Sequence, residues 1–309
     1  MSPRSARPRP TTGKVAQARA ATARARLAAQ QEQAARRRRR LLWVVLPVAL
    51  VMIAVGVLVV VRVAGGRPSA SPGVAAAPAA DSVVSTVTSV PASVLDTVGA
   101  GSVRTPPQRI DAPALTEGGK PRVLYVGAEY CPYCAAERWP MVVALSRFGT
   151  FQNLGQTTSA ADDVYPSTPT LSFHGSGFTS TSVAFTGVET EGNELVNGRY
   201  APLDTLSATD QQLVTTYNAP PYVSSAGAIP FVDIGGRYLI SGASYDPSVL
   251  KGKTHEQVAA ALADPTSPIA QGVDGTANLV TAAICATTSG APAQVCQAAG
   301  VQAAAKALP

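Results

Sequence analysis

The segment Val123-Leu-Tyr-Val-Gly-Ala-Glu-Tyr-Cys-Pro-Tyr-Cys134 carries the strongest structural signal in this chain of 309 residues. Its first four residues are apolar and favour a buried strand, and Gly127 interrupts the run. The residues that follow Cys134, Ala135-Ala-Glu-Arg-Trp139, are good helix formers. The pattern therefore predicts a strand that leads directly into a helix, with two cysteines at the junction.

The spacing of these cysteines predicts a redox site. Cys131 is expected in the first helical turn, where unpaired backbone N–H groups and the helix dipole favour a thiolate. Cys134, about one turn further on and more covered, is placed to attack a mixed disulfide formed at Cys131. Half of a zinc site and an inert bridge are the alternatives. Zinc is disfavoured because a structural site needs four ligands and the chain has only 2 histidines.

The N-terminal region has the features of a membrane anchor. Residues 1–40 contain twelve Lys and Arg but one acid, Glu32, and end in five arginines. Leu41–Val61 carries no charge and is long enough to cross a hydrocarbon core about 30 Å thick. The positive-inside rule then places the N-terminus in the cytoplasm and the rest of the chain outside. We expect a single-pass signal anchor in the cell membrane; a cleaved secretory signal near Ala75–Ala77 is the alternative.

The distribution of charge argues against a nucleic-acid partner. The basic tail accounts for the net charge of +6, because residues 41–309 carry 13 basic and 18 acidic side chains. We therefore interpret Arg36–Arg40 as a topology signal.

Composition divides the chain into four expected regions. Between the anchor and the folded part, Ala, Ser, Pro, Val and Gly dominate, with too few large apolar side chains for a core. All four cysteines follow this stretch, as expected for a domain in an oxidising compartment. The regions are a basic cytoplasmic tail at 1–40, an anchor at 41–64, a flexible linker at 65–107 and a domain at 108–309.

The rest of the domain alternates between strand and helix signals. We expect weaker strands, the last two forming a hairpin, at 153–159, 170–174 and 182–187. Gly235-Gly236 between two apolar runs is a strong hairpin signal. Helices are expected within 203–217, with Ser207 or Thr209 as N-cap, after Thr254, and at 278–286 and 293–305. These elements predict an α/β sheet with helices on both faces.

Ala128-Glu-Tyr-Cys-Pro-Tyr-Cys134 resembles the active-site segment of the thioredoxin superfamily, and its Pro-Tyr dipeptide is the one typical of glutaredoxins. Pro140 resembles the helix-kinking proline of that superfamily. Ile229-Pro230 matches the place of the cis-proline that packs against the cysteine pair. With the anchor included, the chain resembles a group of membrane-anchored thioredoxin-like proteins. The resemblance implies a thioredoxin-like sheet with an insertion at about 176–225.

This resemblance implies a membrane-anchored, extracytoplasmic thiol–disulfide oxidoreductase that needs no cofactor. Its partners would be the thiols or disulfides of exported proteins and a separate membrane redox protein. Cys131 would attack and Cys134 would resolve. The groove that receives the substrate would be shaped by Pro132, Tyr133, Ile229 and Pro230.

The sequence also departs from the family pattern. Tyr125 stands where thioredoxins have a buried acid, so the proton relay attributed to that acid is not carried over. Glu129 lies close by in sequence but is expected to point to solvent. A non-catalytic binding or scaffold protein on the same frame is therefore the second hypothesis. Copper or haem-cofactor assembly is a third, weakened by the lack of nearby Met or His ligands.

Cys285 and Cys296 flank a turn between two expected helices. A structural disulfide between them would close a loop of about 12 residues. A second redox pair that relays electrons to Cys131 is the alternative. No metal ligands are assigned to either pair.

Overall fold

The computed structural model describes residues 77–309, which fall within one compact unit. The expected cytoplasmic tail at 1–40 and the expected anchor at Leu41–Val61 lie outside the described residues. Of the helices in the described part, none has the length and apolar character to cross a membrane.

A mixed sheet forms the centre of the unit, with β4 (Lys120–Gly127) as its middle strand. On one side of β4 lie β12 (Phe231–Ile234) and then β13 (Tyr238–Ser241), each antiparallel to its neighbour. On the other side β9 (Ala184–Glu189) runs parallel to β4 along six residue pairs. Two short strands complete the sheet, β2 (Gln108–Arg109) beside β13 and β3 (Thr116–Glu117) beside the start of β4.

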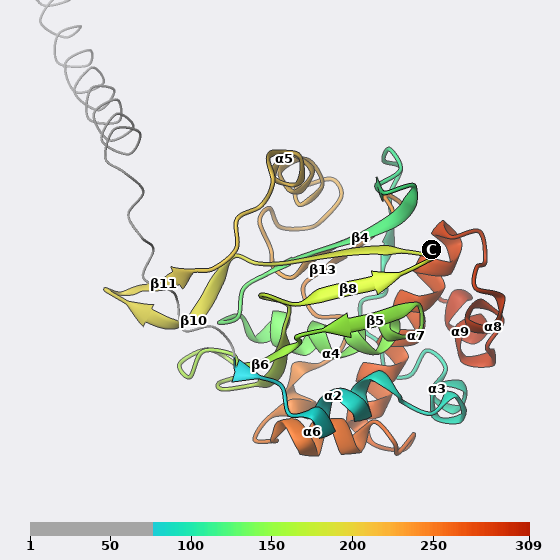
Figure 1. Ribbon diagram of the computed structural model, residues 1–309, viewed down its shortest axis with the longest axis horizontal. Helices are drawn as coiled ribbons and strands as arrows, with labels where there is room; N and C mark the ends of the chain where they lie inside the picture. The colour runs from blue at the N-terminus through green and yellow to red at the C-terminus, as the bar shows by residue number, and fades with distance from the viewer. Residues whose placement is uncertain (1–76) are drawn as a thin grey trace, which may run out of the picture. The chain divides into compact units, whose positions relative to one another are not determined.

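Helices cover both faces of this sheet. Alternate side chains of a strand point to opposite faces, and in β4 Tyr125 joins the core formed with α4 (Pro132–Ser146) and α7 (Pro268–Thr287). Leu124 joins a separate cluster on the face covered by α5 (Ala208–Tyr217). Figure 1 shows α5 on one side of the sheet and α4 and α7 on the other. The prediction of an α/β sheet with helices on both faces is confirmed.

The expected hairpin between residues 170–174 and 182–187 is wrong. The first segment becomes β7 (Pro169–Ser172), which pairs with β6 (Gly155–Thr158), and β6 also pairs with β1 (Ala77–Pro78). The second becomes β9, because the free edge of β4 needs a strand to satisfy its backbone groups.

The expected insertion at about 176–225 is also misplaced, since β9 and α5 belong to the central sheet and its cover. Within that range the hairpin of β10 (Glu191–Val196) and β11 (Arg199–Pro202) forms its own two-stranded sheet. Figure 1 shows this hairpin standing out from the body of the molecule. Between α4 and β9, the chain adds β5 (Gly149–Gln152) and β8 (Gly177–Ser180), which pair with each other.

The expected flexible linker at 65–107 is wrong for its second half, which forms α2 (Asp81–Thr88) and α3 (Ala92–Val98). Val83, Val87 and Leu95 from these helices are buried in the main core. A few medium-sized aliphatic side chains are enough to fold this segment because each helix packs on another helix of the domain. α2 packs on α6 (His255–Ala261), and α3 packs on α7.

The β12–β13 hairpin is confirmed, with Gly235 at φ 65° and Gly236 at φ 71°. Both residues adopt the left-handed region, and together with Arg237 they form a three-residue loop between the paired residues Ile234 and Tyr238. A Cβ on Gly236 would also lie 2.1 Å from the carbonyl oxygen of Pro113, so the turn needs glycine for space as well.

The helices after this hairpin differ from the expectation in length. Thr254 caps α6 through a capping box with Gln257, as expected. However, α7 begins ten residues before the expected start at Asn278, with Ser267 as its N-cap. The expected helix at 293–305 is divided into α8 (Ala293–Cys296) and α9 (Ala299–Ala305). A 3-10 turn, η1 (Pro247–Leu250), precedes α6.

Candidate active site

Cys131 and Cys134 lie at the junction of β4 and α4, as the sequence predicts. Cys131 is the N-cap residue of α4, and the backbone N–H of Cys134 donates to its Sγ at 3.2 Å. Both are free thiols; Cys131 is 4% exposed and Cys134 is fully buried. The sulfur nearer the surface therefore faces the unpaired N–H groups of the first helical turn.

The two thiols differ in acidity. Hydrogen bonding with Cys134 lowers the pKa of Cys131, with a smaller contribution from the positive charge of Arg138, although burial works in the opposite direction. Burial raises the pKa of Cys134 well above its ordinary value, and the neighbouring Cys131 raises it further. Of the two thiols, Cys131 is therefore the one that loses its proton first, while Cys134 stays protonated.

Ile229 and Pro230 reach the same site from the start of β12. The peptide bond between them is cis, as expected, and the carbonyl oxygen of Ile229 lies 3.7 Å from the Cys131 Sγ. Pro230 is buried and Ile229 half-buried. Of the two residues between the cysteines, Pro132 is buried and Tyr133 is 40% exposed. The residues predicted for a substrate groove thus surround one sulfur, and Tyr133 is its exposed member.

A buried ion pair lies behind the cysteines and was not anticipated from the sequence. Arg138 of α4 donates from Nε and Nη2 to the two carboxylate oxygens of Glu189, at 2.8 and 2.7 Å. Its Nη2 also donates to the carbonyl oxygen of Ala128, at 2.7 Å. The signal available in the sequence was the charged pair Glu137-Arg138, flanked on both sides by apolar residues of the helix.

Tyr125 and Glu129 occupy the positions near the pair where an acid could act. Tyr125 is fully buried, and its hydroxyl has no hydrogen-bond partner among the described residues. Burial raises its pKa well above the ordinary value. The expectation that Glu129 points to solvent is wrong, because Glu129 is buried and accepts a hydrogen bond from the Ser172 hydroxyl at 2.5 Å. Burial also raises the pKa of Glu129.

Cys285 and Cys296 form the expected disulfide, with their Cα atoms 5.6 Å apart. The bond joins the end of α7 to α8. Both residues are buried in the main core, so the bond is placed to hold the C-terminal helices together.

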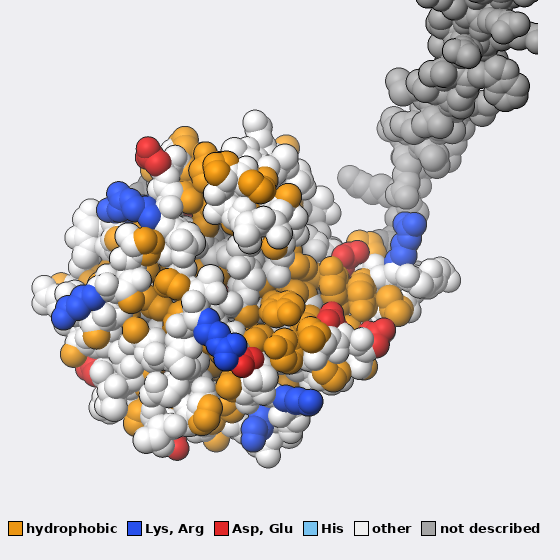
Figure 2. Space-filling view, turned by 180° about the vertical axis from the view of Figure 1, so that it is seen from behind, with side chains coloured by type: hydrophobic (Ala, Val, Ile, Leu, Met, Phe, Trp, Pro, Cys, Tyr) orange, Lys and Arg blue, Asp and Glu red, His pale blue; other side chains and the backbone are white. Residues whose placement is uncertain are grey.

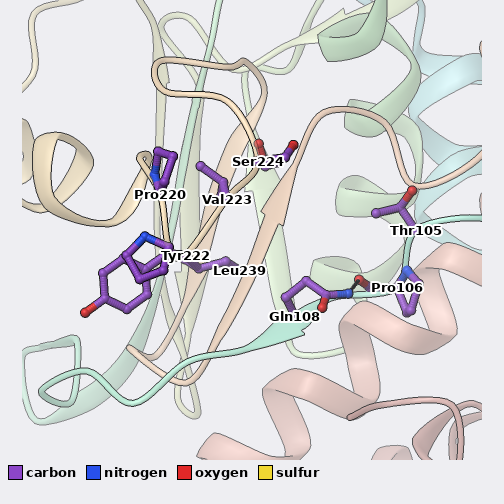
Figure 3. Close-up of a pocket in the computed structure, with 10 residues that line it drawn as sticks. Thr105, Pro106, Gln108, Pro220, Tyr222, Val223, Ser224 and Leu239 are labelled. Atoms are coloured by element: carbon purple, nitrogen blue, oxygen red, sulfur yellow. Dashed lines mark hydrogen bonds between the residues drawn. The ribbon is translucent and has the colours of Figure 1, made fainter.

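A pocket of about 540 Å³ lies on the face of the sheet that α5 covers. Figure 3 shows Pro220, Tyr222, Val223 and Leu239 on one side of it and Thr105 and Pro106 on the other. Its lining includes no cysteine, histidine or carboxylate. The reactive groups are therefore those around Cys131, and within residues 77–309 no three Cys, His, Asp or Glu side chains gather as a metal site.

Comparison with known proteins identifies one relationship. The model of a family described as a domain of unknown function (DUF929) matches residues 107–286, more than half of the chain. No curated protein and no solved structure matches the chain. The matched range contains the cysteine pair, Ile229-Pro230 and every strand of the central sheet.

Proposed function

The chain belongs to the DUF929 family, and we propose that it is a thiol–disulfide oxidoreductase that acts on protein cysteines through Cys131 and Cys134. One observation carries the proposal. Cys131 is a free thiol at a helix N-terminus whose Sγ accepts the Cys134 N–H, and its pKa is lowered while that of Cys134 is raised. This division between a nucleophile and a buried second thiol is what a two-step exchange requires.

The arrangement of the sheet supports a thioredoxin-like fold for this site. The order β9-β4-β12-β13, with β9 parallel and β12 antiparallel to β4, is similar to the thioredoxin arrangement. The cysteines follow the middle strand, and the proline bond opens the antiparallel strand beside it. Helices α4 and α7 share one face, and α5 covers the other.

The exchange proceeds in two balanced steps. The Cys131 thiolate attacks one sulfur of a substrate disulfide, so that a mixed disulfide forms and the other substrate sulfur leaves as a thiolate. The Cys134 thiol then gives its proton to that departing thiolate and attacks the Cys131 sulfur. The second substrate sulfur leaves as a thiol after taking a proton from water. The substrate disulfide is reduced by two electrons and the cysteine pair is oxidised to a disulfide.

The same steps in reverse oxidise a substrate dithiol. Direction depends on the reduction potential of the pair relative to its substrates. The positive charge of Arg138 and the Cys134 N–H both stabilise the Cys131 thiolate, and stabilising the reduced form makes a pair more oxidising. With its raised pKa, Tyr125 stays protonated near neutral pH and is not a base for Cys134.

The charge pattern of the N-terminal region supports the place of action. The arginine run followed by Leu41–Val61 favours a single-pass anchor with a cytoplasmic N-terminus and residues 77–309 outside. A separate membrane redox partner would restore the pair after each turnover, because every exchange leaves the two cysteines in the opposite oxidation state.

The test is disulfide exchange by the purified full chain. We expect reduced protein to exchange with glutathione disulfide, and Cys131→Ser to abolish the reaction. Cys134→Ser should accumulate a mixed disulfide with glutathione, detected as added mass on the intact protein. Cys285→Ala/Cys296→Ala is the matched control and should react at the wild-type rate. If Cys131 resists every thiol reagent in the folded protein, the scaffold hypothesis replaces this one.

A further inference from the structure

Two surface segments contact the residues that precede Cys131. The backbone N–H of Glu129 donates to the carbonyl oxygen of Glu191 in the β10–β11 hairpin, at 2.8 Å. The carbonyl oxygen of Tyr130 accepts from the N–H of Ala160 at 2.9 Å, in the loop between β6 and β7. The hairpin and this loop are therefore positioned by the same two residues that precede Cys131.

Each segment places a tyrosine against a tyrosine next to Cys131. The rings of Tyr130 and Tyr200, from the hairpin, stack with their centroids 4.1 Å apart and their planes at 6°. The rings of Tyr133 and Tyr165, from the loop, meet edge to face at 5.9 Å and 89°. Tyrosines on either side of Cys131 in the sequence thus contact both segments.

Exposed apolar side chains continue this surface outward. Three of the large hydrophobic side chains most open to solvent in the described part are Tyr133, Val164 of the loop and Leu195 of the hairpin, at 40%, 62% and 55%. Leu195 is the cross-strand partner of Tyr200, so the two lie on the same face of the hairpin. Figure 2 shows hydrophobic side chains gathered on the side of the molecule where the hairpin projects, with acidic side chains at their margin.

Acidic side chains lie in both segments. Asp162 and Asp163 are exposed and directly precede Val164 in the loop, and Glu191 is the first residue of β10 in the hairpin. Arg199 of the same hairpin pairs with Val196, the residue after Leu195, and so belongs to the opposite face. The surface next to Cys131 is therefore apolar, aromatic and acidic.

We propose that this docking surface, formed by Tyr133, Val164, Tyr165, Leu195 and Tyr200, binds an extended, unfolded segment of an exported protein in which Leu- or Val-like side chains and a Lys or Arg flank the reacting cysteine. The inference rests on the proposed function and adds its substrate class. Leu- and Val-like side chains are mostly buried once a protein has folded, so a surface that binds them favours an unfolded segment. Lys and Arg complete the match, because they are attracted both to carboxylates and to tyrosine rings.

The test compares two peptides of equal length that carry a central cysteine as a mixed disulfide with glutathione. One has Leu and Lys on each side of the cysteine, and the other has Ser and Glu at those positions. We expect the reduced full chain to exchange at least tenfold faster with the first. Glutathione disulfide, which lacks a peptide segment, provides the reference rate for every variant.

Adjacent residues of the hairpin provide the matched variants. Leu195→Ser should lower the ratio of the Leu-Lys peptide rate to the glutathione disulfide rate about fivefold. Val196→Ser, equally exposed on the opposite face, should keep the wild-type ratio. Asp162→Asn should reduce the preference for Lys over Glu. Asp111→Asn should not, because Asp111 is an exposed residue near the start of β13 and lies in neither segment of the docking surface.

The two proposals fail in different ways. A wild-type protein that does not exchange with glutathione disulfide contradicts the proposed function itself. If that exchange occurs but both peptides react within twofold of each other, the docking surface is wrong and the oxidoreductase stands. Equal ratios for Leu195→Ser and Val196→Ser would also overturn the surface.

Discussion

Arg138 and Glu189 form a two-pronged ion pair with both side chains fully buried. Arg138 lies in the helix that carries the cysteines, and Glu189 ends the parallel strand β9 beside β4. The pair therefore joins the cysteine helix to the sheet. It also places a cation near both thiols, where it contributes to the lowered pKa of Cys131 and offsets a part of the rise in the pKa of Cys134.

Removing one partner of this ion pair should lower the free energy of unfolding. Glu189→Gln leaves a buried guanidinium without its counter-charge, and we expect a loss of about 3–5 kcal/mol in the free energy of unfolding. Arg138→Met/Glu189→Met should recover most of that loss because no lone charge remains. Urea denaturation measures both. Arg104→Gln, which breaks an ion pair with a largely exposed arginine, is the control and should cost less than about 1 kcal/mol.

The lowered pKa of Cys131 predicts a pH profile. The rate of iodoacetamide alkylation follows the thiolate population, so its midpoint should lie below the ordinary cysteine value of 9.0. Hydrogen bonding with Cys134 is the largest cause, so Cys134→Ala should move the midpoint upward. The backbone N–H of residue 134 remains in that variant, so a part of the lowering should persist. A midpoint unchanged by Cys134→Ala would contradict this account.

A buried acid in α7 predicts how stability depends on pH. Asp274 is fully buried, its carboxylate oxygens have no hydrogen-bond partner among the described residues, and burial raises its pKa from 3.8 to about 8. Glu137 behaves similarly, with burial raising its pKa from 4.5 to about 7.

The direction of this pH dependence follows from the protonation of Asp274 in the folded and the unfolded chain. Below pH 3.8 Asp274 is protonated whether the chain is folded or unfolded, so it makes no difference to stability. Between there and about pH 8 only the folded state keeps the proton, so the free energy of unfolding should fall as pH rises. Asp274→Asn should flatten this decline, as measured by urea denaturation at pH 5, 6.5 and 8. Asp264→Asn, a fully exposed site, should leave the slope intact.

The disulfide at the C-terminal helices should contribute stability without contributing to exchange. Cys285→Ala/Cys296→Ala opens a loop of about 12 residues and should cost about 2–3 kcal/mol. Urea midpoints with and without the disulfide give the value. A fall in the exchange rate of this variant, at a pH where it remains folded, would instead support the electron relay between the two cysteine pairs.

Local patterns determined the elements near the active site. The apolar run ending at Gly127, the good helix formers after Cys134 and Gly235-Gly236 all act through their own backbone preferences. They predicted the strand-to-helix junction and the hairpin that brings Ile229 to the Cys131 sulfur. The α7 helix was underestimated because Gly272 and Gly275 weaken its signal, although both are required by close contacts, with Tyr245 and with the backbone of Ala100.

Only the tertiary structure decided which distant segments meet. Pairing β9 with β4, burying Val87 of α2 and turning Glu129 inward depend on free strand edges, core volume and partners far along the chain. No local preference encodes these contacts. The buried Arg138–Glu189 pair and the surface around Tyr133 arise in the same way, because each joins segments whose separation in sequence hides their proximity. The sequence alone thus placed the reactive cysteines, and the packing of the chain determined what surrounds them.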